Sequence, residues 1–226
     1  MDKVVLFIVE GATDKRALAS IFRKIYRNRT VRFEFTHGDI TSDETISIKN
    51  VEDEIYKYVK SYIDISKIKK SDIWQIVQIF DMDGAYADDS RIVEGETREF
   101  FYTEKEISCK NHEKISLRNK HKKELMEYLL SLQEIKGISY EGYYMSCNLD
   151  HVLYNLQNAS DEEKEEYALE FSERYIANIN DFISFLCHSK FSRCESYEAS
   201  WNFIKKGKHS LEQYSNLGLC FLSTEF

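Results

Sequence analysis

Two short apolar runs, each followed at once by carboxylates, constrain the fold of this chain more than any other feature. The first is Val-Val-Leu-Phe-Ile-Val-Glu-Gly-Ala-Thr-Asp at residues 4–14, and the second is Ile-Val-Gln-Ile-Phe-Asp-Met-Asp-Gly at residues 76–84. An apolar run of this length is typical of a parallel strand buried on both faces. In open α/β sheets, ligands bind beyond the carboxyl ends of such strands. We therefore expect four carboxylates to meet in one crevice: Glu10, Asp14, Asp81 and Asp83.

The order of the predicted elements favours a parallel sheet. Strands are expected at 4–9, 31–36 and 74–80, with an amphipathic helix in each interval, and a further aromatic strand is expected near 140–146. A β-α-β-α-β progression of this kind makes a parallel sheet the default. The predicted fold class is therefore α/β, with a mainly parallel four-stranded sheet flanked by helices.

The rest of the chain predicts an insertion and a helical end. Residues 85–122 are polar and poorly periodic, which indicates an insertion near the site. Helices are expected at about 121–132, from Leu149, from the Ser160/Glu163 capping box to about residue 189, and at 196–206. We expect a catalytic domain at 1–160, with the insertion at about 85–122, and a helical C-terminal extension at 161–226.

The charge of the chain limits how it could meet nucleic acid. A net charge of −8 speaks against a protein that coats nucleic acid by bulk attraction. Basic residues nevertheless gather locally, and a solvated helix face is the ordinary interpretation of such a group. The alternative is a patch that positions a polyanion near the carboxylates. The longest basic segment contains Lys110, Lys114, Arg118, Lys120, Lys122 and Lys123.

Cysteine usage and the early apolar run indicate a cytoplasmic protein. The five cysteines are odd in number and form no C-x-x-C pair, so we expect reduced thiols and no zinc site. The run at 4–9 is too short to span a bilayer, and acidic residues follow where a signal-peptide cleavage site would lie. No membrane partner is expected.

The four carboxylates have the chemistry of a divalent-metal site. Asp81 and Asp83 are two residues apart at a strand end, so both can point to one side of the sheet. Oxygen ligands suit Mg²⁺ or Mn²⁺. In phosphodiester cleavage these ions can activate water and stabilise the transition state. Simpler interpretations exist: Asp14 alone favours a helix start through the macrodipole, and Asp-x-Asp-Gly is a common turn.

The segment from Ile8 to Leu18, with Glu10-Gly11-Ala12-Thr13-Asp14 at its centre, resembles the opening motif of TOPRIM domains. The residues Asp81-Met82-Asp83 match the Asp-x-Asp motif of that fold, and the Glu-Gly-x-Thr-Asp form is nearest to OLD-family nucleases. The resemblance covers roughly residues 4–160. It implies a nuclease that cuts DNA or RNA, with Glu10, Asp14, Asp81 and Asp83 as metal ligands and Glu10 also in general acid/base work.

Two further residues complete the expected site. OLD-type nucleases use a later acid, which the resemblance assigns more loosely to Asp150 in Ser146-Cys147-Asn148-Leu149-Asp150. Lys205, shortly after Trp201, is a candidate catalytic cation that could contact phosphate or neutralise transition-state charge. The alternative is that Lys205 complements the dipole of a helix end.

The departures from the family bear on partners. OLD proteins usually carry an ATPase domain, yet this chain has no G-x-x-x-x-G-K-[ST] phosphate loop. It looks similar instead to stand-alone TOPRIM components of phage-defence systems, whose ATPase is a separate polypeptide. We therefore expect a separate ATPase partner that binds the aromatic-rich helices of 161–204, whose aromatic stripe could otherwise be core or an oligomer interface.

Two other functions stay open at this point. Ile79-Phe80-Asp81-Met82-Asp83-Gly84 also resembles the nucleophile motif of haloacid-dehalogenase-type phosphatases, in which Asp81 would attack phosphorus. That function leaves Glu10 and Asp14 without a role. The other alternative is a catalytically silent TOPRIM-like interaction module.

Overall fold

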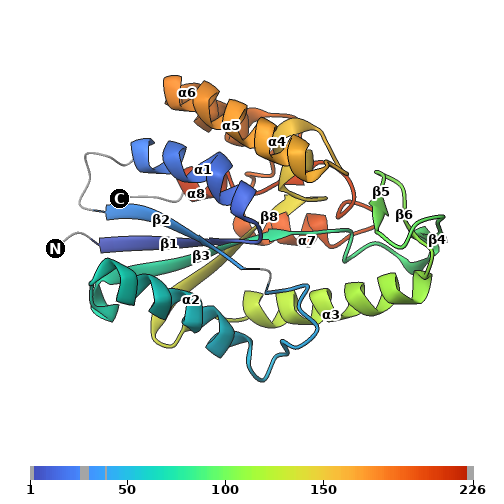
Figure 1. Cartoon of the computed structure of the whole chain (residues 1–226), viewed down its shortest axis with the longest axis horizontal. Helices are drawn as coiled ribbons and strands as arrows, with labels where there is room; N and C mark the ends of the chain where they lie inside the picture. Colours follow the sequence, from blue (N-terminus) through green and yellow to red (C-terminus); the bar gives the residue numbers. More distant parts are fainter. Residues whose placement is uncertain (1–2, 26–30, 39, 223–226) are drawn as a thin grey trace.

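A mixed sheet with helices on both faces forms the centre of the computed structural model, which describes residues 3–25, 31–38 and 40–222 (Figure 1). Four strands run parallel in the order β2-β1-β3-β8, and two short strands, β7 and β9, pair antiparallel with β8. The predicted α/β class is confirmed, whereas the two antiparallel strands were not predicted. The bounds are β1 (Lys3–Val9), β2 (Val31–His37), β3 (Ile73–Asp81), β7 (Glu134–Ile135), β8 (Ile138–Ser146) and β9 (Tyr214–Ser215).

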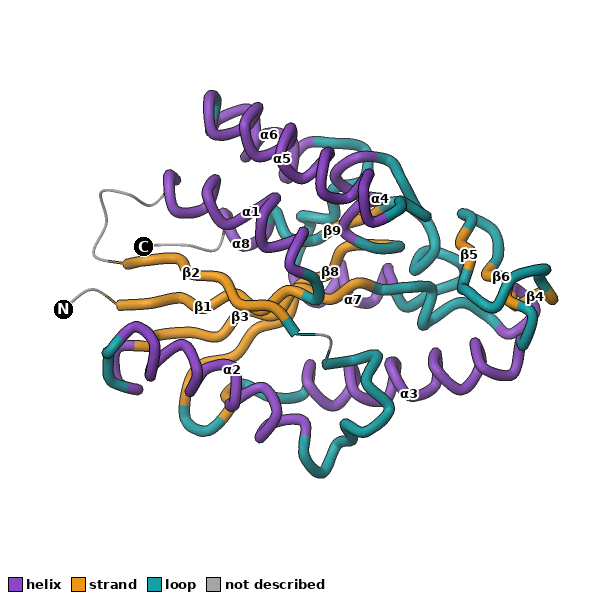
Figure 2. Tube along the Cα trace, viewed as in Figure 1, coloured by secondary structure: helices purple, strands orange, loops and turns teal. Residues whose placement is uncertain are grey.

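The strand order reverses between β1 and β3. The chain passes from β1 through α1 (Ala12–Ile25) to β2 on one side of β1, and then through α2 (Val51–Ser66) to β3 on the other side (Figure 2). The connections from β1 and β3 therefore leave in opposite directions, which opens a crevice at their carboxyl ends. Glu10 and Asp81 stand at these two ends.

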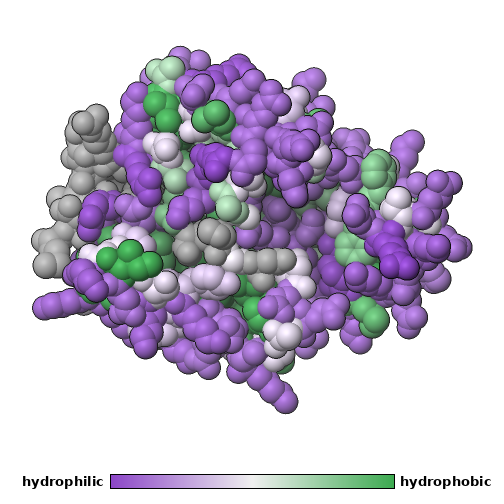
Figure 3. All heavy atoms as spheres, viewed as in Figure 1, coloured by the Kyte–Doolittle hydropathy of each residue, from purple (hydrophilic) through white to green (hydrophobic). Residues whose placement is uncertain are grey.

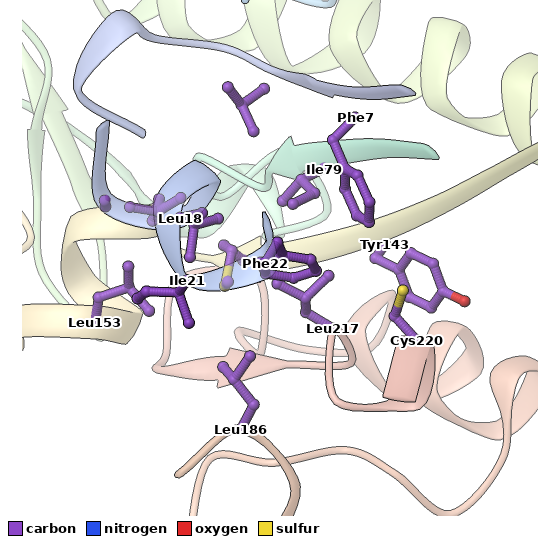
Figure 4. Packing of buried hydrophobic residues seen from close by; sticks show 14 of the residues in the cluster. Phe7, Leu18, Ile21, Phe22, Ile79, Tyr143, Leu153, Leu186, Leu217 and Cys220 are labelled. Atoms are coloured by element: carbon purple, nitrogen blue, oxygen red, sulfur yellow. The ribbon is translucent and has the colours of Figure 1, made fainter. Parts of the chain in front are cut away.

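Two helical layers bury the two faces of the sheet. Side chains alternate along each strand, so Val5 and Phe7 of β1 pack on one layer while Leu6 and Ile8 pack on the other. Burial on both faces explains why the strand sequences are continuously apolar. Figure 4 shows the first core, where Phe22 of α1 packs with strand residues of the sheet. This layer contains α1, α4 (Leu149–Tyr154), α5 (Asp161–Ala177), α6 (Ile179–His188) and α8 (Leu219–Leu222), and the other contains α2, α3 (His112–Leu130) and α7 (Tyr197–Ile204).

The predicted insertion contains a small sheet of its own. Its strands are β4 (Ile92–Glu94), β5 (Phe101–Tyr102) and β6 (Ile107–Cys109), in the order β4-β6-β5. A short 3₁₀ turn at Asp89–Arg91 leads into β4. A second 3₁₀ turn, at Lys70–Asp72, lies earlier in the chain and leads into β3. The helix that follows the small sheet, α3, begins at His112 after the N-cap Asn111, and not near residue 121. The sequence pattern missed its first half because charged residues occupy buried positions there.

The helical end of the chain also differs from the expectation. The single helix expected to reach residue 189 is two helices, α5 and α6, separated at Asn178, whose backbone is extended (φ −138°, ψ 91°). Phe171 and Tyr175 of α5 are buried in the core around α1, and Trp201 of α7 packs against Phe80. The described part of 161–226 thus shares both cores of the molecule. Most of the aromatic stripe is core and is not available to a partner.

The face of the molecule in Figure 3 is mainly hydrophilic, with small, separated apolar groups. All five cysteines are unpaired. Among the helices of the described part, none combines the length and the apolar character needed to cross a membrane.

Candidate functional site

A cavity of about 730 Å³ opens where β1 and β3 end. Its walls come from the carboxyl ends of the strands, from the insertion, and from the segment between α4 and α5. The structure brings all five acids expected from the sequence to this cavity: Glu10, Asp14, Asp81, Asp83 and Asp150.

Asp81 ends β3 and is held by the start of α4. Its Oδ1 accepts a hydrogen bond of 2.9 Å from the backbone N–H of Leu149. Burial raises the pKa of Asp81 well above its usual range, and the negative charges of Glu10, Asp14 and Asp83 add to this effect, while Lys122 opposes it. The surroundings of Asp81 therefore contain too little positive charge to balance its carboxylate.

Asp83 is held by α3. Lys122 Nζ lies 2.6 Å from Asp83 Oδ2 and Arg118 Nη1 lies 3.4 Å from the same oxygen. Arg118 Nη2 also donates to the backbone carbonyl of Asp83 at 3.0 Å. Burial by itself raises the pKa of Asp83, but Lys122 and Arg118 outweigh it and the pKa lies below its usual range.

Asp81 and Asp83 both line the cavity, as their spacing in the sequence allowed, but their direct hydrogen-bond partners differ. The reason is the backbone of Asp83, which has a φ of 48°. A left-handed residue interrupts the alternation of a strand, and Asp is one of the residues that tolerate this conformation. The turn directs Asp83 to α3, whereas Asp81 stays with α4.

Lys122 is a fully buried cation at this site. Its Nζ lies 3.1 Å from Glu10 Oε1, in addition to its contact with Asp83, and 3.4 Å from Ser42 Oγ. Glu10 Oε1 also accepts a hydrogen bond of 3.0 Å from Thr41 Oγ1. Burial alone would lower the pKa of Lys122, but the negative charges of Asp83 and Glu10 raise it by more. The net pKa lies above the usual value for lysine, so the ammonium stays charged. It is a fixed positive charge between two of the expected metal ligands.

Asp14 and Asp150 lie in the first turns of α1 and α4. Asp14 Oδ2 accepts a hydrogen bond of 2.7 Å from the backbone N–H of Gly11. Asp150 Oδ2 lies 3.7 Å from Nζ of Lys164, which belongs to α5. Burial raises the pKa of Asp150 to about 6, with Asp14 adding to the shift and Lys164 opposing it. Asp150, which the resemblance assigned more loosely than the other acids, thus faces the same cavity as Asp14.

The donor chemistry of the cavity fits Mg²⁺ or Mn²⁺, because all five acids offer hard oxygen ligands. In the described part of the chain, no three Asp, Glu, His or Cys side chains form a group that could hold a metal ion. Lys122 and Arg118 hold Glu10 and Asp83, whereas Asp14 and Asp81 accept backbone N–H groups.

The insertion gives the cavity an aromatic rim. Phe100, Phe101 and Tyr102 all line it. The guanidinium of Arg118 packs over the rings of Phe100 and Tyr102, at 4.8 and 5.8 Å from their centroids. Strand alternation leaves Phe101 between them 52% exposed. An exposed ring beside an acidic cavity is suited to stacking on a nucleobase.

Arg118 and Lys122 were not predicted as site residues, although the sequence holds a signal for them. Ile115, Leu125 and Leu129 are buried on one face of α3. Arg118 and Lys122 continue the same spacing of three and four residues, so two cations occupy core-facing positions of an amphipathic helix. Because buried cations are rare unless paired, such positions indicate carboxylate partners.

Lys205 is not brought to the cavity. Its Nζ lies 2.8 Å from Oε2 of Glu127 and 5.9 Å from the ring centroid of Trp201, and it is absent from the cavity lining. The cause is the position of α7, which packs Trp201 against the opposite core from α1. The cation that lines the cavity is Lys164.

Comparison of the chain with protein-family models, with curated proteins and with solved structures finds no match. The indications of function therefore lie in the cavity itself. Its distinguishing property is an excess of carboxylates, two of which are neutralised by buried cations.

Proposed function

We propose that this chain is a divalent-metal-dependent nuclease that hydrolyses phosphodiester bonds of nucleic acid. One observation carries the proposal: acids from separate segments of the chain, at the ends of β1 and β3 and at the starts of α1 and α4, line a single cavity. A bound Mg²⁺ or Mn²⁺ would supply neutralisation of the phosphate and activation of water. Glu10, Asp14, Asp81, Asp83 and Asp150 are the residues that would hold it.

Three residues that line the cavity have distinct proposed roles. Glu10 is fixed by Thr41 and Lys122 and faces the cavity, where a carboxylate can accept a proton from water. Lys164 lines the opposite wall and can contact a phosphate oxygen. Phe101 can stack on a base next to the cleaved bond.

The resemblance to stand-alone TOPRIM components supports a place in an antiphage defence system together with a separate ATPase. Because most of the aromatic stripe of α5 and α6 is buried, a partner would have to use the remaining exposed residues. Tyr167 and Leu169 of α5 are the exposed large hydrophobic side chains of these two helices, at 37% and 52%. Co-expression with the product of a neighbouring gene, followed by copurification, tests this proposal.

The nuclease activity is tested by incubating the purified chain with Mg²⁺ or Mn²⁺ and with plasmid, single-stranded DNA or tRNA. We expect cleavage that requires the metal and that Asp81→Asn reduces to the metal-free level. Asp64→Asn, which changes an exposed acid of α2, is the matched control and should cleave like the wild type. Absence of cleavage with every substrate, or unchanged cleavage by Asp81→Asn, would contradict the proposal. Hydrolysis of simple monoesters that depends on Asp81 and not on Glu10 would favour the phosphatase.

A further inference from the structure

The insertion places one exposed aromatic ring beside the acids of the cavity. Phe101 is 52% exposed, and among the described residues that line the cavity it is the one aromatic side chain exposed to this degree. Figure 1 shows the small sheet to which it belongs beyond the carboxyl ends of the central strands. A ring in this position can meet the flat face of a nucleobase.

The neighbours of Phe101 on both sides are held by one buried cation. The Arg118 guanidinium packs over the rings of Phe100 and Tyr102, and its Nη1 donates a hydrogen bond of 3.0 Å to the Tyr102 hydroxyl. Its Nη2 donates to the backbone carbonyl of Asp83. The same side chain therefore connects β5, which carries Phe101, with the turn that carries Asp83. The backbone that presents the ring is thus preformed, so ordering it on binding costs little.

The charge of the cavity disfavours recognition through the nucleic-acid backbone. Among its described lining residues, seven are Asp or Glu and one, Lys164, is a Lys or Arg. Duplex binding draws much of its affinity from phosphate contacts with several cations, and a duplex brings the phosphates of two strands. Nucleic acid bound here needs a contribution that does not depend on charge. Stacking on Phe101 supplies one.

A base that stacks on a protein ring must be unpaired. In a double helix each base lies within the stack, and an enzyme reaches such a base only by extruding it at a cost in free energy. A single strand offers the faces of its bases without this cost. The cavity, at about 730 Å³, is of the size that encloses a small molecule. It suits a short stretch of single strand and is too small for a double helix.

We infer that the site takes single-stranded nucleic acid and that Phe101 is the ring on which an unpaired base of the substrate stacks. Phe101 determines specificity in this arrangement, because it offers a contact that a duplex cannot use. Arg118 is a positioning residue, because it holds the β5 neighbours of the ring. The inference rests on the proposed function, and it deepens that function by naming the class of substrate.

The class of nucleic acid can be tested by binding alone, without cleavage. Fluorescence anisotropy with a labelled oligonucleotide of about 12 nucleotides compares the single strand with the same strand annealed to its complement. The measurement is made with the full chain in a chelator and again in Ca²⁺. We expect the single strand, as DNA or as RNA, to bind about ten-fold more tightly than its duplex. A free mononucleotide should bind more weakly than the single strand.

Variants of Phe101 separate stacking from other contacts. Phe101→Ala should weaken binding of the single strand by about ten-fold and leave binding of the duplex unchanged. Phe101→Leu keeps an apolar side chain without a π-face and should behave like Phe101→Ala, whereas Phe101→Trp should bind like the wild type. Ile65→Ala is the matched control: it truncates an exposed apolar side chain of α2, away from the cavity, and should not change binding.

Several results would overturn the inference. These are a duplex or a mononucleotide that binds as tightly as the single strand, absence of binding by every oligonucleotide, or unchanged binding of the single strand by a folded Phe101→Ala variant. If that variant does not fold, the comparison of single strand and duplex with the wild type still decides. The nuclease assay is separate. Preference for the single strand without metal-dependent cleavage contradicts only the proposed function, and equal cleavage of duplex and single strand contradicts only this inference.

Discussion

Asn158 is bonded to the backbone of Tyr102 at both of its polar atoms. Its Nδ2 donates to the carbonyl oxygen of Tyr102 and its Oδ1 accepts from the Tyr102 N–H, each at 2.8 Å. Tyr102 belongs to β5 of the insertion, and Asn158 lies in the segment between α4 and α5. Because both residues line the cavity, this pair ties its two walls together.

We predict that Asn158→Ala loosens the insertion without unfolding the molecule. Two hydrogen bonds are lost, which together contribute about 2 kcal/mol to local stability. Hydrogen exchange at the Tyr102 amide should become faster, while exchange in β1 and β3 should not change. Asn202→Ala, an exposed change on α7, is the control. Unchanged exchange at Tyr102 would show that the wall is held by other contacts.

We predict that Asp81→Asn and Asp83→Asn change stability in opposite directions when no metal is present. Asp81 is buried among like charges, so its neutral isostere should stabilise the fold at pH 7. Asp83→Asn removes a partner from Lys122 and Arg118, which costs about 3 kcal/mol when a buried cation is left with fewer partners. Urea unfolding of both variants in a chelator measures the difference. Equal effects would contradict the difference between the surroundings of Asp81 and those of Asp83.

We predict that Gly84→Ala is strongly destabilising, while Gly137→Ala is not. Both glycines have a positive φ, of 68° and 74°. A Cβ at Gly84 would lie 2.5 Å from Leu211 Cδ2 and 2.6 Å from Ile107 Cδ1, whereas a Cβ at Gly137 meets no atom within 4 Å. Gly137→Ala should therefore cost only the conformational strain, about 1 kcal/mol. Thermal unfolding should show a clearly larger loss for Gly84→Ala.

We predict that His151 makes the fold less stable as the pH falls below neutrality. The ring is buried and Nδ1 accepts from the Cys147 N–H at 3.2 Å, so burial lowers the pKa of His151 to about 4. The stability from the neutral ring is complete above pH 6.5 or so and is lost as the pH falls from there toward 4, by up to about 3 kcal/mol.

The matched variant is His151→Asn, whose side-chain oxygen can accept the same hydrogen bond but does not titrate. Asp150 shifts in the opposite sense, because its raised pKa favours folding as it becomes protonated below about pH 6. This contribution is common to both proteins and cancels in their difference. The free energy of unfolding should therefore fall more steeply with acid in the wild type. Parallel curves between pH 7 and 4 would contradict the prediction.

The sequence was most informative at the ends of the strands. Glu10 and Asp81 could be placed in one crevice because two uninterrupted apolar runs define β1 and β3, and the topology of an open sheet follows from their order. Asp14 followed from the helix start. Asp150 came only from the resemblance, since nothing in its local pattern distinguishes it from an ordinary acid in a first helical turn.

Contacts between distant segments could not be predicted. Lys122 is 112 residues from Glu10 and 39 residues from Asp83 in the sequence. The two buried cations of α3, Arg118 and Lys122, also weaken the apolar pattern that would reveal the first half of this helix. The break at Asn178 was also missed, because both flanking segments are helical by pattern; residues of both helices pack in the core that contains α1. Lys205 was misplaced because its partner, Glu127, belongs to another helix.

The segment around β9 has a consequence for how the protein is made. Ser210 accepts a hydrogen bond from the N–H of Gly84 through its carbonyl, and Leu211 and Gln213 bond to the segments that follow β8. The turns that carry Asp83 and Asp150 are therefore braced by residues 210–213, which follow Asp150 by about 60 positions in the sequence. During synthesis, β1, β3 and β8 emerge from the ribosome before this brace exists. The cavity can thus reach its final shape only after residues 210–213 have also emerged, so any activity of the site waits for this later segment.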